Sequence, residues 1–147
     1  MRRMDRFVDD KSWLEGLLKG ASVLHVAVSR SDGTPSLSVC RYRYADETLC
    51  LREGLDFEDV ASLEPGSVVC FQLFVDAKVI PAAGGANYTM HYSSITGWGC
   101  VASLCGRDGL PGGWDSDLDP GESKFLKITI DRMTGKSNPC PRPLPDA

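Results

Sequence analysis

The feature that most constrains the fold is a series of short apolar runs, each closed by residues that favour tight turns. "VLHVAVS" (residues 23–29) precedes the pair Asp32-Gly33, which is typical of hairpin turns. A second run spans Pro35–Tyr44, and "TLCLRE" follows as a third. Because short strands joined by tight turns are typical of small antiparallel β-barrels, the pattern predicts such a fold with about six strands.

The second half of the chain supplies the remaining strands. "SVVCFQLFV" is a continuous apolar run, which predicts a strand buried on both sides. "DAKVIPAAGGANYTM" is interpreted as a long connection, because it contains proline and a glycine pair. "HYSSITGWGCVASL" and "SKFLKITID" are the last two predicted strands.

Two helices are expected. "DDKSWLEGLLKG" predicts an N-terminal helix that Asp9 or Asp10 caps and that ends at Gly20. "DFEDVASLEPG" predicts a short helix after the third strand. The segment 104–122 is rich in glycine and proline and is expected to be a loop. The 147 residues suit a single domain, 1–137, followed by a Pro-rich tail, 138–147.

Charge and cysteine spacing exclude several classes of protein. The net charge of −4 argues against a basic surface that binds nucleic acid. No apolar run approaches the length of a membrane span, and the N-terminus lacks the apolar stretch of a secretory signal. None of the six cysteines forms a C-x-x-C pair, so we expect neither a metal site nor structural disulfides. These features favour a cytoplasmic location.

Four segments, in this order, resemble one known family. "MRRMDR", "VAVSRSDGTPSLSV", "YSSITGWG" and "ITIDRMTGK" are similar to segments of the pyridoxamine 5'-phosphate oxidase-like, FMN-binding split barrels, and of their nitroimidazole-resistance branch in particular. The resemblance covers most of residues 1–137. It implies a mainly β fold, namely a six-stranded antiparallel split β-barrel that forms a homodimer with two flavin sites at the dimer interface.

The resemblance also assigns candidate cofactor-binding residues. The second strand would lie along the flavin, the end of the third strand would contact it, and a polar side chain of the late strand would lie near the ring. Carried over by position, these residues are Ser38, Val39, Cys40, Arg41, Arg52 and Ser94.

The chain departs from the family where the cofactor phosphate is usually bound. Relatives often carry Gly-His-Lys in the loop after the third strand, whereas this chain has Leu55 and Asp56 in the positions of the His and Lys. An aspartate repels a phosphate dianion. If FMN binds, the cations have to come from elsewhere, and Arg41, Arg43 and Arg52 are the nearest candidates. The alternative is that these arginines line a solvated face and pair weakly with nearby acids such as Glu47.

Function therefore remains open between three hypotheses. The first is an FMN-dependent oxidoreductase that acts on a small aromatic or nitro compound, for which the sequence identifies no catalytic residue. The second is a split-barrel protein that has lost FMN and binds another ligand. The third is a haem-binding relative in which His25 or His91 is an exposed axial ligand, although a structural role is the commoner fate of such histidines.

Overall fold

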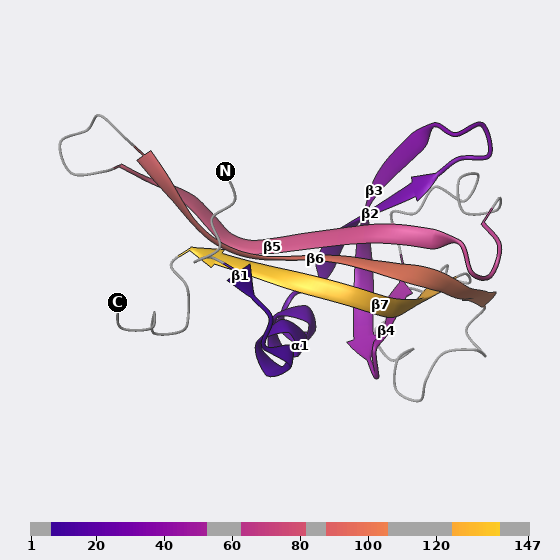
Figure 1. The fold of residues 1–147 in the computed structure, drawn as a ribbon, viewed down its shortest axis with the longest axis horizontal. Coiled ribbons are helices and arrows are strands. Elements are labelled where there is room, and N and C mark those ends of the chain that lie inside the picture. Colours follow the sequence, from indigo (N-terminus) through magenta and orange to yellow (C-terminus); the bar gives the residue numbers. More distant parts are fainter. Residues whose placement is uncertain (1–6, 53–62, 82–87, 106–124, 139–147) are drawn as a thin grey trace.

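The computed structural model describes residues 7–52, 63–81, 88–105 and 125–138. The predicted helix after the third strand, most of the predicted loop 104–122 and nearly all of the Pro-rich tail lie outside these residues. Leu55 and Asp56 also lie outside them. Seven strands and one helix are described (Figure 1): β1 Phe7–Val8, α1 Lys11–Gly20, β2 Val23–Ser29, β3 Pro35–Ala45, β4 Thr48–Leu51, β5 Val68–Pro81, β6 Tyr88–Cys105 and β7 Phe125–Asn138.

All described strands belong to one antiparallel sheet with the order β1-β7-β4-β3-β2-β5-β6. An additional β6–β7 pairing joins two members of this order, so that six strands pair in a closed ring. The mainly antiparallel β prediction is confirmed, but the sheet has seven strands and not six. The extra strand, β1, is only two residues long and pairs with Lys136 and Gly135 of β7, and so short a strand leaves no periodic pattern in the sequence.

Tight turns set the register of β2, β3 and β4. Gly33 has a φ of 88°, a conformation that glycine adopts without steric cost. The turn between β3 and β4 consists of Asp46 and Glu47, both with positive φ, as a two-residue hairpin turn requires. Because this turn is so short, Ala45 pairs with Thr48 and every later pair follows from it.

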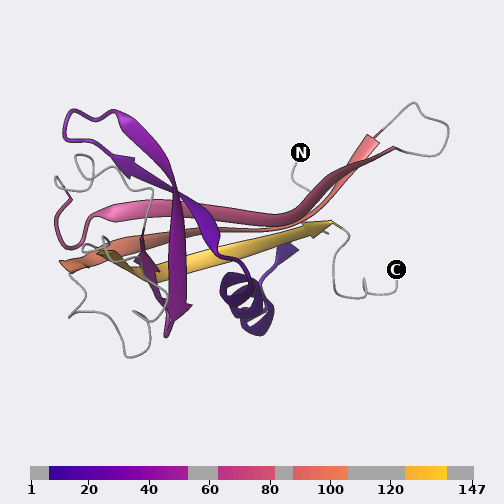
Figure 2. The same cartoon turned by 180° about the vertical axis from the view of Figure 1, so that it is seen from behind.

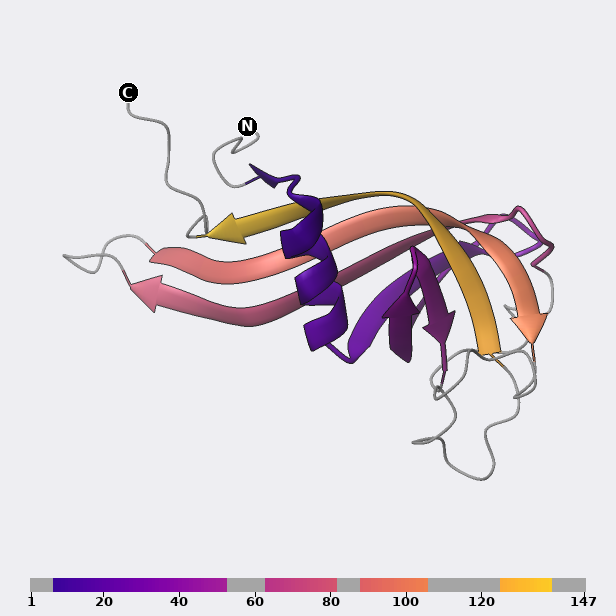
Figure 3. The same cartoon turned by 90° about the horizontal axis from the view of Figure 1, so that it is seen from below.

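Helix α1 crosses one side of the sheet (Figure 3). The Asp10 carboxylate caps it by accepting a hydrogen bond from the Trp13 backbone N–H at 3.0 Å, as predicted. Leu14 and Leu18 are its buried residues. The helix lies so close to β7 that a Cβ on Gly135 would be 2.5 Å from the Trp13 ring, so this glycine permits the contact.

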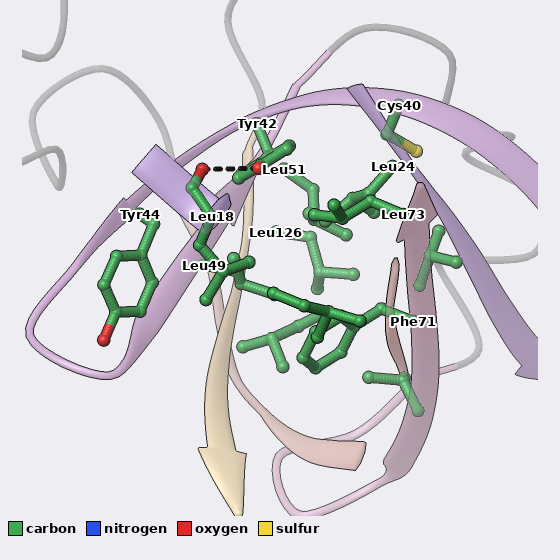
Figure 4. Packing of buried hydrophobic residues seen from close by; sticks show 14 of the residues in the cluster. Leu18, Leu24, Cys40, Tyr42, Tyr44, Leu49, Leu51, Phe71, Leu73 and Leu126 are labelled. Carbon is green, nitrogen blue, oxygen red and sulfur yellow. Dashed lines mark hydrogen bonds between the residues drawn. The ribbon is translucent and has the colours of Figure 1, made fainter. Parts of the chain in front are cut away.

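The hydrophobic core is formed by Leu14 and Leu18 of α1 and by side chains of strands β2 to β7, and Figure 4 shows part of it. The strands contribute every second residue to it, and the largest fully buried side chains include Phe71, Leu24 and Ile128. Tyr42 is buried among them and donates a hydrogen bond from its hydroxyl to the Leu18 carbonyl oxygen at 2.5 Å, which satisfies a carbonyl in the last turn of α1.

Two predictions about β5 are wrong. The run "SVVCFQLFV" is buried on one side only, since Val68 and Phe74 are 67% and 54% exposed. The segment 76–90 is not a long connection, because β5 continues to Pro81 and β6 begins at Tyr88. The hydrogen bonds between the two strands sustain this pairing despite the proline, which occupies the last position of β5.

Cys40, Cys50, Cys70 and Cys100 carry free thiols. Among the described residues, no helix combines the length and the apolarity needed to cross a membrane.

Candidate functional site

Strand β3 separates its side chains into two groups. Cys40, Tyr42 and Tyr44 belong to the hydrophobic core. Because successive side chains of a strand point to opposite sides, the intervening residues point away from the core. Leu37 and Val39, 69% and 53% exposed, lie in this second group. We call this side of the sheet the outward face.

Cross-strand pairing extends the outward face over four adjacent strands. On β3 and β2, Val39 is opposite His25, and on β5 and β6, Gln72 is opposite Thr96. His25 also pairs with Gln72, so these four residues form one row across the sheet. By the same alternation the outward face comprises Leu37, Val39, Arg41 and Arg43 of β3, Val23, His25 and Ala27 of β2, Val68, Cys70, Gln72 and Phe74 of β5, and Ser94, Thr96 and Trp98 of β6.

A cationic cavity lies where this face ends at helix α1, and residues from both sides of β3 line it. It has a volume of about 270 Å³ and lies between the C-terminal end of α1, β3 and the residue that follows β4. The Arg52 backbone N–H donates to the Arg41 carbonyl oxygen at 2.8 Å, which continues the β3–β4 ladder and places the two arginines opposite each other. The residues that line the cavity are Leu18, Lys19, Ala21, Ser22, Arg41, Tyr42, Arg43, Tyr44 and Arg52.

The burial of these cations differs. Arg52 is only 3% exposed, whereas Arg41 and Arg43 are half-buried and Lys19 is exposed. Guanidinium and ammonium groups bind carboxylates and phosphates through charge-assisted hydrogen bonds, so the cavity can hold such an anion.

An apolar groove lies farther along the outward face. Its volume is about 450 Å³, and its floor is formed by β2 and β5. The rings of His25 and Phe74 stack there with centroids 6.1 Å apart and planes 14° apart. The Gln72 amide donates to the Thr96 hydroxyl at 3.3 Å. The lining residues are His25, Ala27, Leu37, Cys70, Phe71, Gln72, Phe74 and Thr96.

The structure brings together some of the residues that the sequence assigns to the cofactor and separates others. Arg41 and Arg52 line the same cavity. Val39 and Ser94 lie on the same face but are separated by strands β2 and β5, and Ser94 is opposite Phe74. The candidates therefore divide between the cationic end of the face and its far side.

Cys40 and Ser38 belong to the other side of β3. Cys40 is fully buried in the core, and burial raises the pKa of its thiol to about 12, so this side chain is a neutral packing group. Ser38 is half-buried and lies on the same side in the alternation of the strand. Both residues could contribute only backbone groups to a ligand on the outward face.

Sequence reasoning missed Lys19 and Phe74, and it named His25 only as a possible axial ligand of haem. Lys19 is part of the cationic cavity, and its position in the last turn of α1 gave no functional signal. His25 and Phe74 form the aromatic pair of the apolar groove. The alternation in "VLHVAVS" could have placed His25 outward, since Leu24, Val26 and Val28 are the buried residues of that strand.

Comparisons with solved structures identify the fold. A protein from Bacteroides thetaiotaomicron assigned to 5-nitroimidazole antibiotic resistance matches with a TM-score of 0.66 and 20% identity over 88% of this chain and 85% of that one. An FAD and heme binding protein from Mycobacterium smegmatis matches with a TM-score of 0.70 and 18% identity, covering 97% and 77% of the two chains. A Corynebacterium glutamicum protein assigned as a pyridoxamine 5'-phosphate oxidase matches with a TM-score of 0.55 and 13% identity, covering 92% and 94%.

No protein-family model matches this chain, and no curated protein matches its sequence. The fold of the chain is nevertheless defined by its structure. The chain has the pyridoxamine 5'-phosphate oxidase-like split-barrel fold, and its structural neighbours include a nitroimidazole-resistance protein and flavin-binding and haem-binding proteins. The family resemblance of the sequence is thereby confirmed at the level of the fold.

Proposed function

We propose that this protein binds FMN on its outward face and acts as an oxidoreductase on small aromatic or nitro compounds. One observation carries the proposal. The outward side of β3 changes from apolar, at Leu37 and Val39, to cationic, at Arg41 and Arg43, and a cavity adjoins each end. A flavin mononucleotide has the matching asymmetry, with a planar aromatic ring at one end and a phosphate at the other.

The cationic end has the donor chemistry that a phosphate needs. Arg41 and Arg52 are direct cross-strand neighbours, and a planar guanidinium can donate to two phosphate oxygens at once. Arg52 is almost fully buried, and charge-assisted hydrogen bonds are stronger where water is excluded. These arginines would take the place of the basic loop residues that Leu55 and Asp56 replace.

The apolar groove suits a planar ring. His25 and Phe74 present stacked rings beside the exposed Leu37 side chain, and aromatic rings stack favourably on such surfaces. The polar groups of Gln72 and Thr96 lie in the same groove, where they can orient the ring or a substrate by hydrogen bonds. A small aromatic acceptor could share this groove with the cofactor.

When bound, the flavin supplies the redox chemistry by accepting electrons from a donor such as a nicotinamide and passing them to an acceptor. The residues of this chain bind, orient and exclude water, and none has to act as an acid or base. A protein that only binds and orients the cofactor and substrate needs no catalytic triad, and the sequence contains no pattern typical of a hydrolytic triad.

The outward face also supports a homodimer with the cofactor sites at the interface. Soluble monomers rarely expose large contiguous apolar patches, and this face carries the exposed side chains of Val23, Leu37, Val39, Val68 and Phe74. A second copy of the chain would cover them and enclose a ligand in the groove.

The test is a titration of the purified protein with FMN, followed by the quenching of flavin fluorescence and by the visible absorbance of the protein after gel filtration. We expect a saturable, co-eluting yellow complex that a nicotinamide donor reduces in the presence of a nitroaromatic acceptor. Protein that stays colourless in excess FMN would instead support the flavin-free split-barrel alternative.

One observation favours haem as a second candidate ligand. His25 is half-buried within an apolar groove of about 450 Å³, an environment in which an imidazole can serve as an axial ligand. His91 lies outside this groove, opposite Lys78. A Soret band on addition of haem that disappears in His25→Ala, and persists in His91→Ala, is the result that this candidate predicts.

A further inference from the structure

Helix α1 presents its C-terminal end to the cationic cavity. The chain passes from α1 directly into β2, which lies next to β3 (Figure 2). The cavity is lined at this end by Leu18 and Lys19 of the last turn and by Ala21 and Ser22, which follow the helix. A helix C-terminus carries a partial negative charge and carbonyl groups without intrahelical partners. An anion bound in this cavity therefore meets a local repulsion that other groups have to offset.

The carbonyl groups at this end are engaged by donors of the protein itself. The Leu17 carbonyl oxygen accepts a hydrogen bond from the Ala21 backbone N–H at 3.1 Å. The Leu18 carbonyl oxygen accepts one from the Tyr42 hydroxyl at 2.5 Å (Figure 4). The Ser22 carbonyl oxygen accepts one from the Tyr42 backbone N–H at 3.1 Å. Tyr42 alone thus donates two hydrogen bonds to the segment that borders the cavity.

The Tyr42 hydroxyl is held as a donor toward the helix. The residue is only 5% exposed, and burial raises the pKa of its hydroxyl well above the ordinary value. The group therefore keeps its proton at physiological pH and adds no negative charge to the cavity. Because this proton is directed to the Leu18 carbonyl oxygen, it reduces the negative potential that this oxygen would otherwise contribute.

Lys19 adds a positive charge at the same end of the helix. It is the basic residue of the last turn of α1, it is exposed, and it lines the cavity. A cation in the last turn of a helix interacts favourably with the macrodipole, and the effect falls off within that turn. Lys11 provides a contrast, because it lies in the first turn, pairs with Glu47 at 2.8 Å and is not among the residues that line this cavity.

We propose that Tyr42 and Lys19 are positioning residues that allow an anion to bind at a helix C-terminus, and that they select a phosphorylated ligand over its neutral counterpart. Tyr42 acts through the Leu18 carbonyl group, and Lys19 acts through the charge of the helix end. The inference rests on the proposed function for the identity of the ligand as FMN, whereas the selection itself applies to any phosphate in the cavity. Neither residue has to touch the phosphate, which distinguishes both from Arg41 and Arg52.

The experiment measures the affinity of the full chain for FMN and for its phosphate-free analogue riboflavin by fluorescence titration. The wild type is compared with Tyr42→Phe, Lys19→Gln and the double variant. We expect each single substitution to lower the ratio of FMN affinity to riboflavin affinity by about two- to fivefold, and the double variant by at least about fivefold. A purely structural role would weaken the binding of both flavins alike and leave this ratio unchanged.

Two further variants serve as matched controls. Lys19→Arg keeps the charge and should hold the affinity ratio within about twofold of the wild type. Lys11→Gln removes the same charge from the other end of the helix, about 12 Å away along its axis and beyond the Debye length of about 8 Å, and should also stay within about twofold. An effect of Lys11→Gln as large as that of Lys19→Gln would assign the loss to the net charge of the protein and overturn the inference.

Inorganic phosphate tests the cavity without a flavin. The response is the rise of the thermal unfolding midpoint in phosphate over that in sodium chloride of equal ionic strength. This rise should be smaller in Tyr42→Phe and Lys19→Gln than in the wild type and Lys11→Gln. Protein that responds in this way but binds no FMN would overturn the proposed function and support the inference.

Two results of these measurements would overturn the inference itself. The first is a wild type that prefers FMN, with the same affinity ratio and the same phosphate response in Tyr42→Phe and Lys19→Gln, which would leave the proposed function standing. The second is a wild type that neither distinguishes FMN from riboflavin nor responds to phosphate.

Discussion

The two sides of β3 differ in what constrains their residues. The inner side consists of Cys40, Tyr42 and Tyr44, whose neighbours in the core leave little freedom of size or polarity. The outward side changes within one strand from Leu37 and Val39 to Arg41, although exposure alone would allow almost any residue there. The inner side therefore accounts for the fold, and the choice of residues on the outward side needs a ligand or a partner to explain it.

The largest expected difference between the two sides of β3 is in how much a substitution lowers the free energy of unfolding. Tyr42→Ala should lower the free energy of unfolding by about 3–5 kcal/mol, because it leaves a cavity in the core. Val39→Ala, three positions away on the outward side, should change the free energy of unfolding of the separated subunit by less than about 0.5 kcal/mol. Urea unfolding followed by circular dichroism measures both. Similar losses in the two variants would show that the sides are not distinct.

The next effect separates the two sides by ligand affinity. Arg41→Ala should weaken FMN binding roughly 10- to 100-fold, which corresponds to the loss of one or more charge-assisted hydrogen bonds. Arg43→Ala should weaken it less, because Arg41 is opposite Arg52 whereas Arg43 is opposite Cys50. Fluorescence titration provides the measurement, with unfolding midpoints as a control. Equal and unchanged affinities in both variants would remove Arg41 from the phosphate site.

A smaller effect tests the hydrogen bond between the core and α1. Tyr42→Phe should cost about 1 kcal/mol, because the Leu18 carbonyl oxygen then lacks the hydroxyl donor in a buried position. The urea midpoint of the variant against that of the wild type measures this loss, and an unchanged midpoint would show that the hydroxyl makes no net contribution to stability.

The smallest effect concerns pH. Burial raises the pKa of the Cys40 thiol from 9.0 to about 12, so between these values the unfolded chain has lost this proton while the folded chain retains it. Stability is therefore expected to fall as pH rises above 9. In Cys40→Ala this decline should be shallower than in the wild type between pH 8.5 and 9.5. An identical pH dependence would mean that the thiol ionises freely in the folded protein.

The sequence predicted the elements that local chemistry determines. The Asp10 cap, the end of α1 at Gly20 and the turn at Asp32-Gly33 depend on residues close in sequence and were found as predicted. The sequence did not predict the exposure of Phe74 and Val68. An apolar run does not reveal which of its two sides is left exposed to solvent in a single subunit.

The candidate site was predictable only in part, because it depends on how strands far apart in the sequence pair with each other. The placement of Arg52 opposite Arg41 follows from a turn of only two residues, Asp46 and Glu47, and the sequence indicates that turn without giving its length. The pairing of Val79 with Met90 depends on a β-bulge between β5 and β6 at Asp76, for which the sequence has no glycine signal. Both features arise from register, which emerges only when strands are paired.

The most direct test compares FMN with riboflavin, which has the same ring but no phosphate, in the wild type and in Arg41→Ala. If the cationic end of the outward face binds the phosphate, the wild type should bind FMN at least about tenfold more tightly than riboflavin, and Arg41→Ala should bind the two with nearly equal affinity. Equal affinity of the wild type for FMN and riboflavin, or a preference for FMN that survives in Arg41→Ala, would contradict the account.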